Sequence, residues 1–334
     1  LITGNQGYIG SRLSVYLKKK EKNLEIYGSD IGYFKKYLIK KNNEKKNIYK
    51  QYNNDFSQLK KRDLLNIDCV IHLASISNDP IGNKFKRLTI QTNILKTKKF
   101  IELCKKSKVK NFIFASSCSV YGNNKKMCCE NTKSNPLTIY AISKVLIENF
   151  LKKNSNKKFL ATSLRFATAS GTSPRIRNDI VVNNLVMSAI MNREILLNSD
   201  GGSLRPLIDI DDMCKTFLWF IKNRGKINDA YFCVNVGSKK NNFKIINLAK
   251  IISRILNNIK IKKNNKNIDK RSYKVSFKKL SKLRPKLLLN KSINKSIKEV
   301  YKDLKKIKRN RISSYIRLNQ LEIYLKNAAR DRRS

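Results

Sequence analysis

Short apolar runs alternate with amphipathic segments through the first half of the chain. Each run spans a few residues and is rich in branched and aromatic side chains, which is typical of strands. The run at 68–74 is apolar almost throughout, as expected for a strand covered on both faces. The pattern predicts strands at residues 1–2, 24–29, 48–52, 68–74, 111–115 and 159–166.

The segments between these runs have the period of helices. Leu13, Tyr16 and Leu17 share one face of the segment after the first strand, and a longer helix is expected over about 86–106. Another helix begins near Tyr140. Strands that alternate with helices over the first 166 residues predict an α/β fold with an open, doubly wound, mostly parallel sheet.

The pattern is less regular after Phe166. The clearest element there is a buried strand at 231–236, and Asp211-Asp212 is a candidate N-terminal cap for the helix that follows it in the chain. Helices are expected at 184–192, 213–222 and 243–257, with a short extended segment at 205–209. We interpret the polar stretches at 35–50, 170–184 and 258–268 as loops, and the tail beyond Lys305 as helical or frayed.

The charge of the chain is strongly unbalanced. It carries 73 basic and 23 acidic residues, a net charge of +50, and the last part from Lys239 holds 31 basic against 5 acidic residues. The lysines lie mostly in short pairs on polar faces, without interleaved aromatic residues or a nucleic-acid motif. A compositional bias towards Lys, Asn and Ile therefore explains the charge better than a polyanion partner, which stays open as an alternative.

Cysteine and membrane signals are weak. The seven cysteines are scattered and none forms a C-x-x-C pair, so we expect no zinc or other metal site and a reducing compartment, the cytoplasm. No run of about 18 apolar residues is present, and a transmembrane helix is not expected. The chain begins without Met and almost inside its first strand, so we expect a few residues to be missing from its start.

Three glycines follow the first strand at intervals of three residues. Gly4, Gly7 and Gly10 lie between a strand and a helix, the context that a dinucleotide fingerprint requires. Gly4 allows a tight turn, Gly7 lets the backbone approach a pyrophosphate at the helix N-terminus, and Gly10 lets the helix pack close to the sheet. The spacing differs from the commoner G-x-G-x-x-G, and a glycine-rich turn without a ligand is the alternative.

An acidic residue follows the second strand at the distance expected of a ribose ligand. Asp30 lies 20 residues after Gly10, where its carboxylate can accept hydrogen bonds from the adenosine ribose. This placement favours NAD over NADP, whose extra phosphate Asp30 would repel, although Lys35 and Lys36 weaken the preference. Asp55, after the third strand, is a candidate for an adenine contact.

The next candidate residues follow the fifth strand. Ser117 lies at its carboxyl end, and Tyr140 and Lys144 are four residues apart, so they share one helix face. A phenol has a pKa of about 10, which is too high for a base at neutral pH. Lys144 and a positive nicotinamide ring would favour the phenolate, so Tyr140 could take a proton from a sugar hydroxyl that Ser117 also binds. The alternative is a buried tyrosine beside a solvated lysine.

The chain contains a single histidine. His72 lies inside the strand at 68–74, so a packed core residue is favoured over a catalytic one. Zinc or Ser–His chemistry would therefore lack its usual histidine.

These residues resemble a known family, the extended short-chain dehydrogenase/reductases that act on nucleotide sugars, or NAD-dependent epimerase/dehydratase family. The resemblance implies a Rossmann domain at 1–166, to which the strand at 231–236 returns, a smaller substrate-binding region at 167–305, and a basic tail at 306–334. It also implies a homodimer. The matching stretches are Thr3–Gly10, His72–Pro80, Ser116–Gly122, Tyr140–Lys144, Asn183–Leu185, Arg205–Asp212 and Arg271–Tyr273.

The resemblance also assigns roles to residues. It implies catalysis by Ser117, Tyr140 and Lys144, with a nucleotide-diphosphate sugar bound by Ser117, Asn184, Arg205 and Arg271. The alternatives are a helix cap for Asn184 and surface ion pairs for the two arginines. We expect NAD to be bound by Gly4, Gly7, Tyr8, Ile9, Gly10, Asp30, Asp55, Ala74, Asn93, Tyr140 and Lys144.

The sequence departs from the family pattern in three places. Dehydratases of the family typically carry an Asp-Glu pair after the active Ser or Thr, where this chain has Cys118 and Ser119. Familiar epimerases carry Asn at Thr168, which leaves the sugar open, and the stretch 282–285 lacks the usual Gly-Phe before its proline. The sequence therefore predicts an NAD-dependent nucleotide-sugar epimerase acting at C4. The alternatives are a dehydratase or reductase of the same family and a non-catalytic protein that binds RNA or another polyanion.

Overall fold

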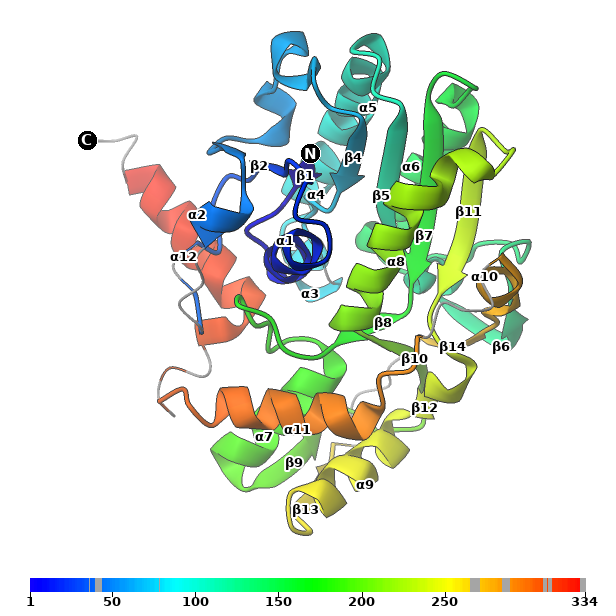
Figure 1. The fold of residues 1–334 in the computed structure, drawn as a ribbon. Helices are drawn as coiled ribbons and strands as arrows, with labels where there is room; N and C mark the ends of the chain where they lie inside the picture. Colours follow the sequence, from blue (N-terminus) through cyan, green and yellow to red (C-terminus); the bar gives the residue numbers. More distant parts are fainter. Residues whose placement is uncertain are drawn as a thin grey trace.

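Seven parallel strands form the central sheet of the computed structural model (Figure 1). Their order is β11-β7-β5-β4-β1-β2-β3, and it reverses direction between β1 and β4, where doubly wound sheets bind their ligands. The Rossmann-type fold predicted from the sequence is therefore confirmed. The strands are β1 (Ile2–Thr3), β2 (Tyr27–Ser29), β3 (Lys50–Tyr52), β4 (Cys69–His72), β5 (Asn111–Ser117), β7 (Leu160–Phe166) and β11 (Tyr231–Val236). The structure describes residues 1–35, 37–39, 44–77, 79–264, 271–283, 289–308, 311 and 314–330.

Helices connect the strands and continue through the second half of the chain. The helix expected over 86–106 is present in three pieces, the middle one being a π-helical turn, η3, at Gln91–Lys96. No described helix is both long and apolar enough to cross a membrane. The α-helices are α1 (Tyr8–Lys20), α2 (Glu44–Asn47), α3 (Asp79–Lys84), α4 (Lys86–Ile90), α5 (Thr97–Lys106), α6 (Ile139–Asn154), α7 (Val181–Asn192), α8 (Ile210–Asn223), α9 (Ile245–Ile255), α10 (Lys278–Leu283), α11 (Ile293–Leu304) and α12 (Arg317–Arg330).

A separate apolar core covers each face of the sheet. Successive side chains of a strand point to opposite faces, and in β5 the buried Ile113 packs into one core while Phe112 and Phe114 pack into the other. The first core is closed by α1 and α8, and the second by α5 and α6. The near-continuous apolar runs of the sequence arise because the central strands are buried on both sides.

A third core lies in a lobe beneath the carboxyl ends of the central strands (Figure 1). It is built from buried side chains of α7, α9 and α11, including Leu185, Leu248 and Ile297. Small sheets complete this half of the chain, with the order β12-β10-β8 in one and the pairs β13-β9 and β14-β6 in the others. Their strands are β6 (Asn123–Cys128), β8 (Thr168–Ser170), β9 (Glu194–Leu197), β10 (Leu204–Asp209), β12 (Asn242–Lys244), β13 (Lys260–Lys263) and β14 (Ser272–Val275).

Two expectations for secondary structure are wrong. The stretch 258–268 was expected to be a loop, yet its residues 260–263 form β13, which pairs in parallel with β9. Most side chains of β13 are exposed lysines, so backbone hydrogen bonds rather than an apolar pattern hold it. Asp209, rather than Asp211-Asp212, caps α8, because its side chain accepts a hydrogen bond from the Asp211 amide.

Smaller differences concern element boundaries. The expected loop at 35–50 contains the short helix α2, and α7 begins three residues before the predicted start at 184. The predicted helix at 243–257 is α9, preceded by β12. Lys36, Asn78 and the Arg284-Pro285 pair lie outside the described residues.

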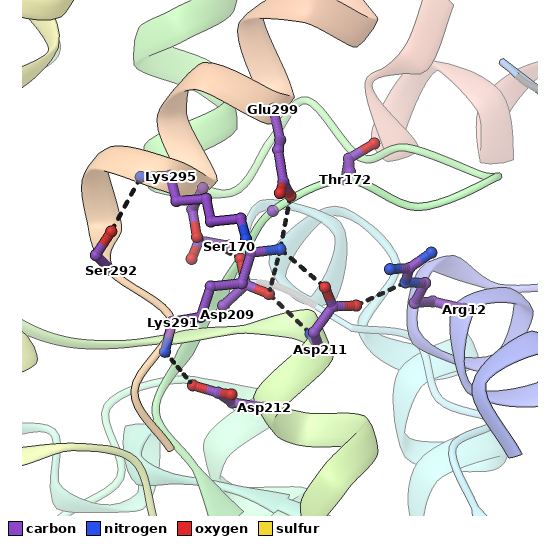
Figure 2. Close-up of polar contacts among 12 residues, drawn as sticks. Arg12, Ser170, Thr172, Asp209, Asp211, Asp212, Lys291, Ser292, Lys295 and Glu299 are labelled. Carbon is purple, nitrogen blue, oxygen red and sulfur yellow. Dashed lines mark hydrogen bonds and ion pairs between the residues drawn. The ribbon is translucent and has the colours of Figure 1, made fainter. Parts of the chain in front are cut away.

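A buried ionic cluster ties the C-terminal part of the chain to the first helix (Figure 2). Lys291 Nζ lies 2.6 Å from Glu299 Oε2, 2.8 Å from Asp211 Oδ2 and 3.3 Å from Asp209 Oδ1. The other oxygen of Asp211 accepts a 2.7 Å hydrogen bond from Arg12 Nε on α1. One lysine therefore connects the segment before α11 to the start of α8, and through Asp211 to α1.

Candidate active site

A cavity of about 1340 Å³ opens between the carboxyl ends of the central strands and the lobe of α7. It is large enough for a dinucleotide together with a second ligand. Nearly all of the candidate residues from the sequence line it: Gly4, Gly7, Tyr8, Ile9, Gly10, Asp30, Asp55, Ala74, Ser117, Tyr140, Lys144, Asn184, Arg205 and Arg271. Asn93 is the exception.

The glycine turn has the close contacts that only glycine tolerates. Gly4 has a φ of +74°, and a Cβ atom on it would lie 2.8 Å from the Ala74 amide nitrogen. A Cβ on Gly10 would lie 2.3 Å from the Gly4 carbonyl oxygen. Helix α1 starts directly after Gly7 without a side-chain cap, so its first amides and its dipole favour an anion at this end. The turn therefore fits the pyrophosphate of a dinucleotide.

Asp30 lies beside this turn. Its Oδ2 accepts a 2.9 Å hydrogen bond from the Gln6 amide and its Oδ1 a 2.8 Å bond from the Gly32 amide. Burial raises the pKa of Asp30, against the opposing effects of these two amides and of Arg175 and Arg317. The carboxylate faces the cavity at the end of β2, which is the position that a ribose ligand requires.

Asp55 and Asn93 are held by the protein in different ways. Asp55 caps a short turn through the Ser57 amide at 2.9 Å and pairs with Lys96 Nζ at 2.7 Å, while still lining the cavity. Asn93 lies in the π-helical turn, away from the cavity lining. Its side-chain amide binds the backbone N–H and C=O of Ile76 at 2.8 and 2.9 Å. Asn93 therefore fixes the loop after β4, and its contact with the cofactor stays a prediction.

Ser117, Tyr140 and Lys144 meet at the wall of the cavity. Ser117 ends β5, and its hydroxyl accepts a 3.1 Å hydrogen bond from the Ser119 amide while lying close enough to Tyr140 to lower the pKa of that phenol. Thr138 caps α6 through the Ala141 amide at 3.2 Å, which places Tyr140 in the first helical turn. Lys144, one turn later, has its Nζ 5.2 Å from the centre of the Tyr140 ring. The structure thus brings the three predicted catalytic residues together.

Burial perturbs both titrating groups of this trio. It raises the pKa of Tyr140, against the opposing effects of the Arg177 charge and the Ser117 hydrogen bond. It lowers the pKa of Lys144 to about 7, although Glu148 acts in the other direction. Perturbed pKa values of neighbouring groups in a cavity are typical of catalytic sites.

Polar residues of the lobe line the other end of the cavity. Asn184 lies in the first turn of α7, after the cap position, and its side-chain amide donates to the Asn178 carbonyl at 3.2 Å. Arg205 stacks over the Tyr273 ring at 5.6 Å and donates to the Arg271 carbonyl. Both arginines face the cavity, so two cations lie at this end.

Sequence reasoning missed two arginines of the cavity wall. Arg177, which the sequence placed only in a polar loop, pairs with Asp179 at 2.6 Å and donates to the Ser77 hydroxyl at 3.0 Å. Arg317 lies in the basic tail, which the sequence predicts to be helical or frayed but does not place at the cavity. The helical spacing of Leu318, Leu321 and Leu325 is the signal that could have revealed a docked helix.

His72 is a core residue, as the sequence predicts. Its ring nitrogens bond to the hydroxyls of Thr3 at 2.8 Å and Thr97 at 3.2 Å. Aromatic rings surround it, and burial lowers its pKa to about 3. Histidine chemistry at neutral pH therefore has no basis at this position.

The sequence can now be compared with known proteins. The profile of the NAD dependent epimerase/dehydratase family matches residues 1–237. The chain belongs to this family. It is an NAD-dependent enzyme of nucleotide-sugar epimerisation or dehydration, and its cofactor is NAD.

Individual relatives include both kinds of enzyme. A dTDP-D-glucose 4,6-dehydratase of Dictyostelium discoideum is 30% identical over 282 residues, which are 77% of this chain and 61% of the relative. A UDP-glucuronate 4-epimerase of Thermodesulfobacterium geofontis is 28% identical over 286 residues, 83% of this chain and 86% of the relative. The crystal structure of UDP-glucuronic acid 4-epimerase from Bacillus cereus with UDP-glucuronic acid and NAD has a TM-score of 0.76. At 22% identity it covers 91% of this chain and 98% of that chain.

The position of Asp30 in this epimerase/dehydratase leads to a prediction about its cofactor. We expect NAD to bind at least ten times more tightly than NADP, because the buried carboxylate would face the extra phosphate. Titration of the cofactor-free protein with each dinucleotide measures the ratio. Asp30→Asn should reduce it, whereas Asp63→Asn, on a nearby surface turn, should leave it unchanged. Equal affinities of the wild type for NAD and NADP would show that Asp30 does not select the cofactor.

Proposed function

We propose that this chain is a nucleotide-sugar epimerase that acts at C4. The main support is the meeting of Ser117, Tyr140 and Lys144 at the cavity wall, next to two positions that lack acid–base groups. Cys118 is fully buried, its thiol donates to the Arg165 carbonyl at 3.1 Å, and burial raises its pKa well above the usual range. Ser119 has no carboxylate to offer. Removal of water from a sugar would lack the acid and base that the family's dehydratases carry here.

The chemistry follows from the three predicted catalytic residues. In the proposed reaction Tyr140 accepts the proton of the C4 hydroxyl as the carbonyl forms, and Ser117 donates a hydrogen bond to the same oxygen. NAD, when bound, supplies a reversible acceptor for the C4 hydride. After the keto sugar has rotated in the site, the hydride returns to the opposite face of C4, and Tyr140 returns its proton to the C4 oxygen. The charge of Lys144 stabilises the phenolate that exists before Tyr140 accepts the proton and again after Tyr140 has returned it.

The nucleotide half of the substrate is assigned to the lobe. Arg205 and Arg271 present two cations to one end of the cavity, which suits a diphosphate, and Asn184 lies beside them in the lining. We accordingly assign the cofactor to residues 1–166 together with β11, and the nucleotide sugar to 167–305. Movement of the sugar alone, with the diphosphate fixed, would let both faces of C4 reach the same hydride acceptor.

The second candidate is a dehydratase, which the 30% identity to the dTDP-D-glucose 4,6-dehydratase favours. To decide, UDP-glucose, UDP-glucuronic acid and dTDP-glucose are each incubated with the NAD-loaded enzyme and the products are analysed by mass spectrometry and proton NMR. An epimer keeps the mass of its substrate, whereas a dehydratase product has lost water. Loss of water without any epimer would overturn the proposal.

We also propose that the enzyme is a homodimer through the outer face of α4, η3 and α6. Leu95 is 54% exposed and Leu146 39% exposed, and Ile90 and Ile142 enlarge this apolar surface. Light scattering should give twice the chain mass, and Leu95→Lys with Leu146→Lys should give the monomer. Leu65→Lys, at an exposed leucine elsewhere, is the matched control. A monomeric wild type would refute the dimer.

A further inference from the structure

The last described helix returns from the lobe to the cofactor side of the molecule. Figure 1 shows α12, in red, away from α11 and at the opposite edge from β11. Leu321 of this helix is 1% exposed, packs with Ile76 and Ile81, and lines the cavity. The Tyr324 ring lies 4.5 Å from that of Tyr33, so the helix is docked along its length.

Arg317, the first residue of α12, is buried in the cavity wall. Only 3% of it is exposed, and its guanidinium lies 3.9 Å from the centre of the Phe34 ring. It donates to the Arg175 carbonyl at 3.1 Å and to Gln320 Oε1 at 2.7 Å. Planar stacking and two fixed donors hold the group in one orientation.

The charges around Arg317 favour an anion. Arg175 and Arg177 act on it as like charges, and Asp30 and Asp179 as opposite ones. Burial lowers the pKa of Arg317 to about 9, and the two neighbouring arginines add to this effect. Three guanidinium groups beside two carboxylates leave an excess of positive charge at a buried wall. Such an excess is costly unless a ligand with negative charge compensates it.

We propose that Arg317 binds the adenosine diphosphate half of NAD and that α12 is a strap which retains the cofactor. Arg317 stacks on Phe34, four residues after Asp30, and all three residues line the cavity, so the arginine lies beside the part of the dinucleotide that Asp30 recognises. The negative diphosphate would balance the positive charge that Arg317 brings to this wall. Leu321 fixes the strap against the loop after β4, which Asn93 holds from the other side. This inference rests on the NAD cofactor and is independent of the sugar reaction.

The test measures dinucleotide binding directly. In cofactor-free protein, Arg317→Ala should weaken the binding of NAD and of ADP-ribose by the same factor, about ten- to hundredfold, since both contain the diphosphate. The affinity of Arg317→Lys for both ligands should lie between those of the wild type and Arg317→Ala, because lysine keeps the charge but cannot form the planar stack on Phe34. Lys326→Ala, at an exposed lysine of the same helix, is the control and should bind like the wild type.

The strap predicts a second result. Removal of residues 317–334 should increase the dissociation rate of the cofactor and change its association rate little. Both rates are measured by stopped-flow fluorescence with the reduced cofactor. Circular dichroism checks that each variant is folded. If Arg317→Ala does not fold, the binding comparison is made with Arg317→Lys instead. Folded Arg317 variants that bind ADP-ribose like the wild type would overturn the proposal, as would an unchanged dissociation rate after truncation.

Discussion

Tyr140→Phe is expected to lower the turnover of the nucleotide sugar by about 10²–10⁴, the usual contribution of a general base. The substitution keeps the ring beside Lys144 and removes only the hydroxyl beside Ser117. Neither His72 nor Cys118 can take over the proton, because His72 is buried among aromatic rings and Cys118 is held as a thiol. The chemical step should therefore lose most of its rate without loss of the fold.

The measurement compares turnover with cofactor binding in the same protein. NAD should bind to the Tyr140→Phe variant within a few-fold of the wild type, because the glycine turn and Asp30 are unchanged. Tyr49→Phe, at an exposed tyrosine of the surface, is the control and should keep full activity. Full activity of the Tyr140→Phe variant would contradict the mechanism, whichever sugar is the substrate.

Lys291→Met is expected to destabilise the protein by about 3–5 kcal/mol, the usual cost of removing one partner from a buried ion pair. Lys291 lies against Asp209, Asp211 and Glu299, and these carboxylates raise its pKa although burial alone would lower it. Burial opposes ionisation of Asp211 as well, but hydrogen bonds from Arg12 and Lys291 keep the pKa of this carboxyl below its ordinary value. Without the lysine, at least one carboxylate is left buried and uncompensated.

Urea denaturation at neutral pH measures the loss, with Lys295→Met on the exposed side of α11 as the control. The difference from the wild type should shrink as the pH falls below about 4, because protonation removes the uncompensated charge. This sign follows from the lowered pKa of Asp211, whose stabilising effect is present above its unfolded pKa and is lost on acidification. A loss below about 1 kcal/mol at neutral pH would show that the cluster is only a surface feature.

The sequence predicts the central sheet well for a physical reason. Strands such as β4 and β5 are buried on both faces, so consecutive apolar residues form their central part and the run is visible without a structure. The ligand site is predicted with them, because the carboxyl ends of parallel strands converge. Ser117 and Tyr140 are found in this way although 23 residues separate them.

The features that the sequence does not predict depend on contacts between segments that are distant in the chain. The loop that carries Arg177 has no periodic pattern, and only its packing against Ser77 places it beside Tyr140. The strand β13 is an edge of exposed lysines, so its partner β9 rather than its own side chains decides its conformation. The docking of α12 is decided by the pocket that Ile76 and Ile81 form for Leu321.

The last strand of the central sheet has a consequence for folding of the protein during its synthesis on the ribosome. β11 pairs with β7 from Tyr231↔Ala161 to Val236↔Phe166, so the whole segment between these strands must be synthesised before the sheet can close. Until Val236 has emerged, β7 offers unpaired backbone groups and apolar side chains along a free edge. A nascent chain at this length presents the kind of surface that chaperones bind and that pairs wrongly with other chains. The central sheet cannot be completed until the segment between β7 and β11, which contains α7 and α8, has been synthesised.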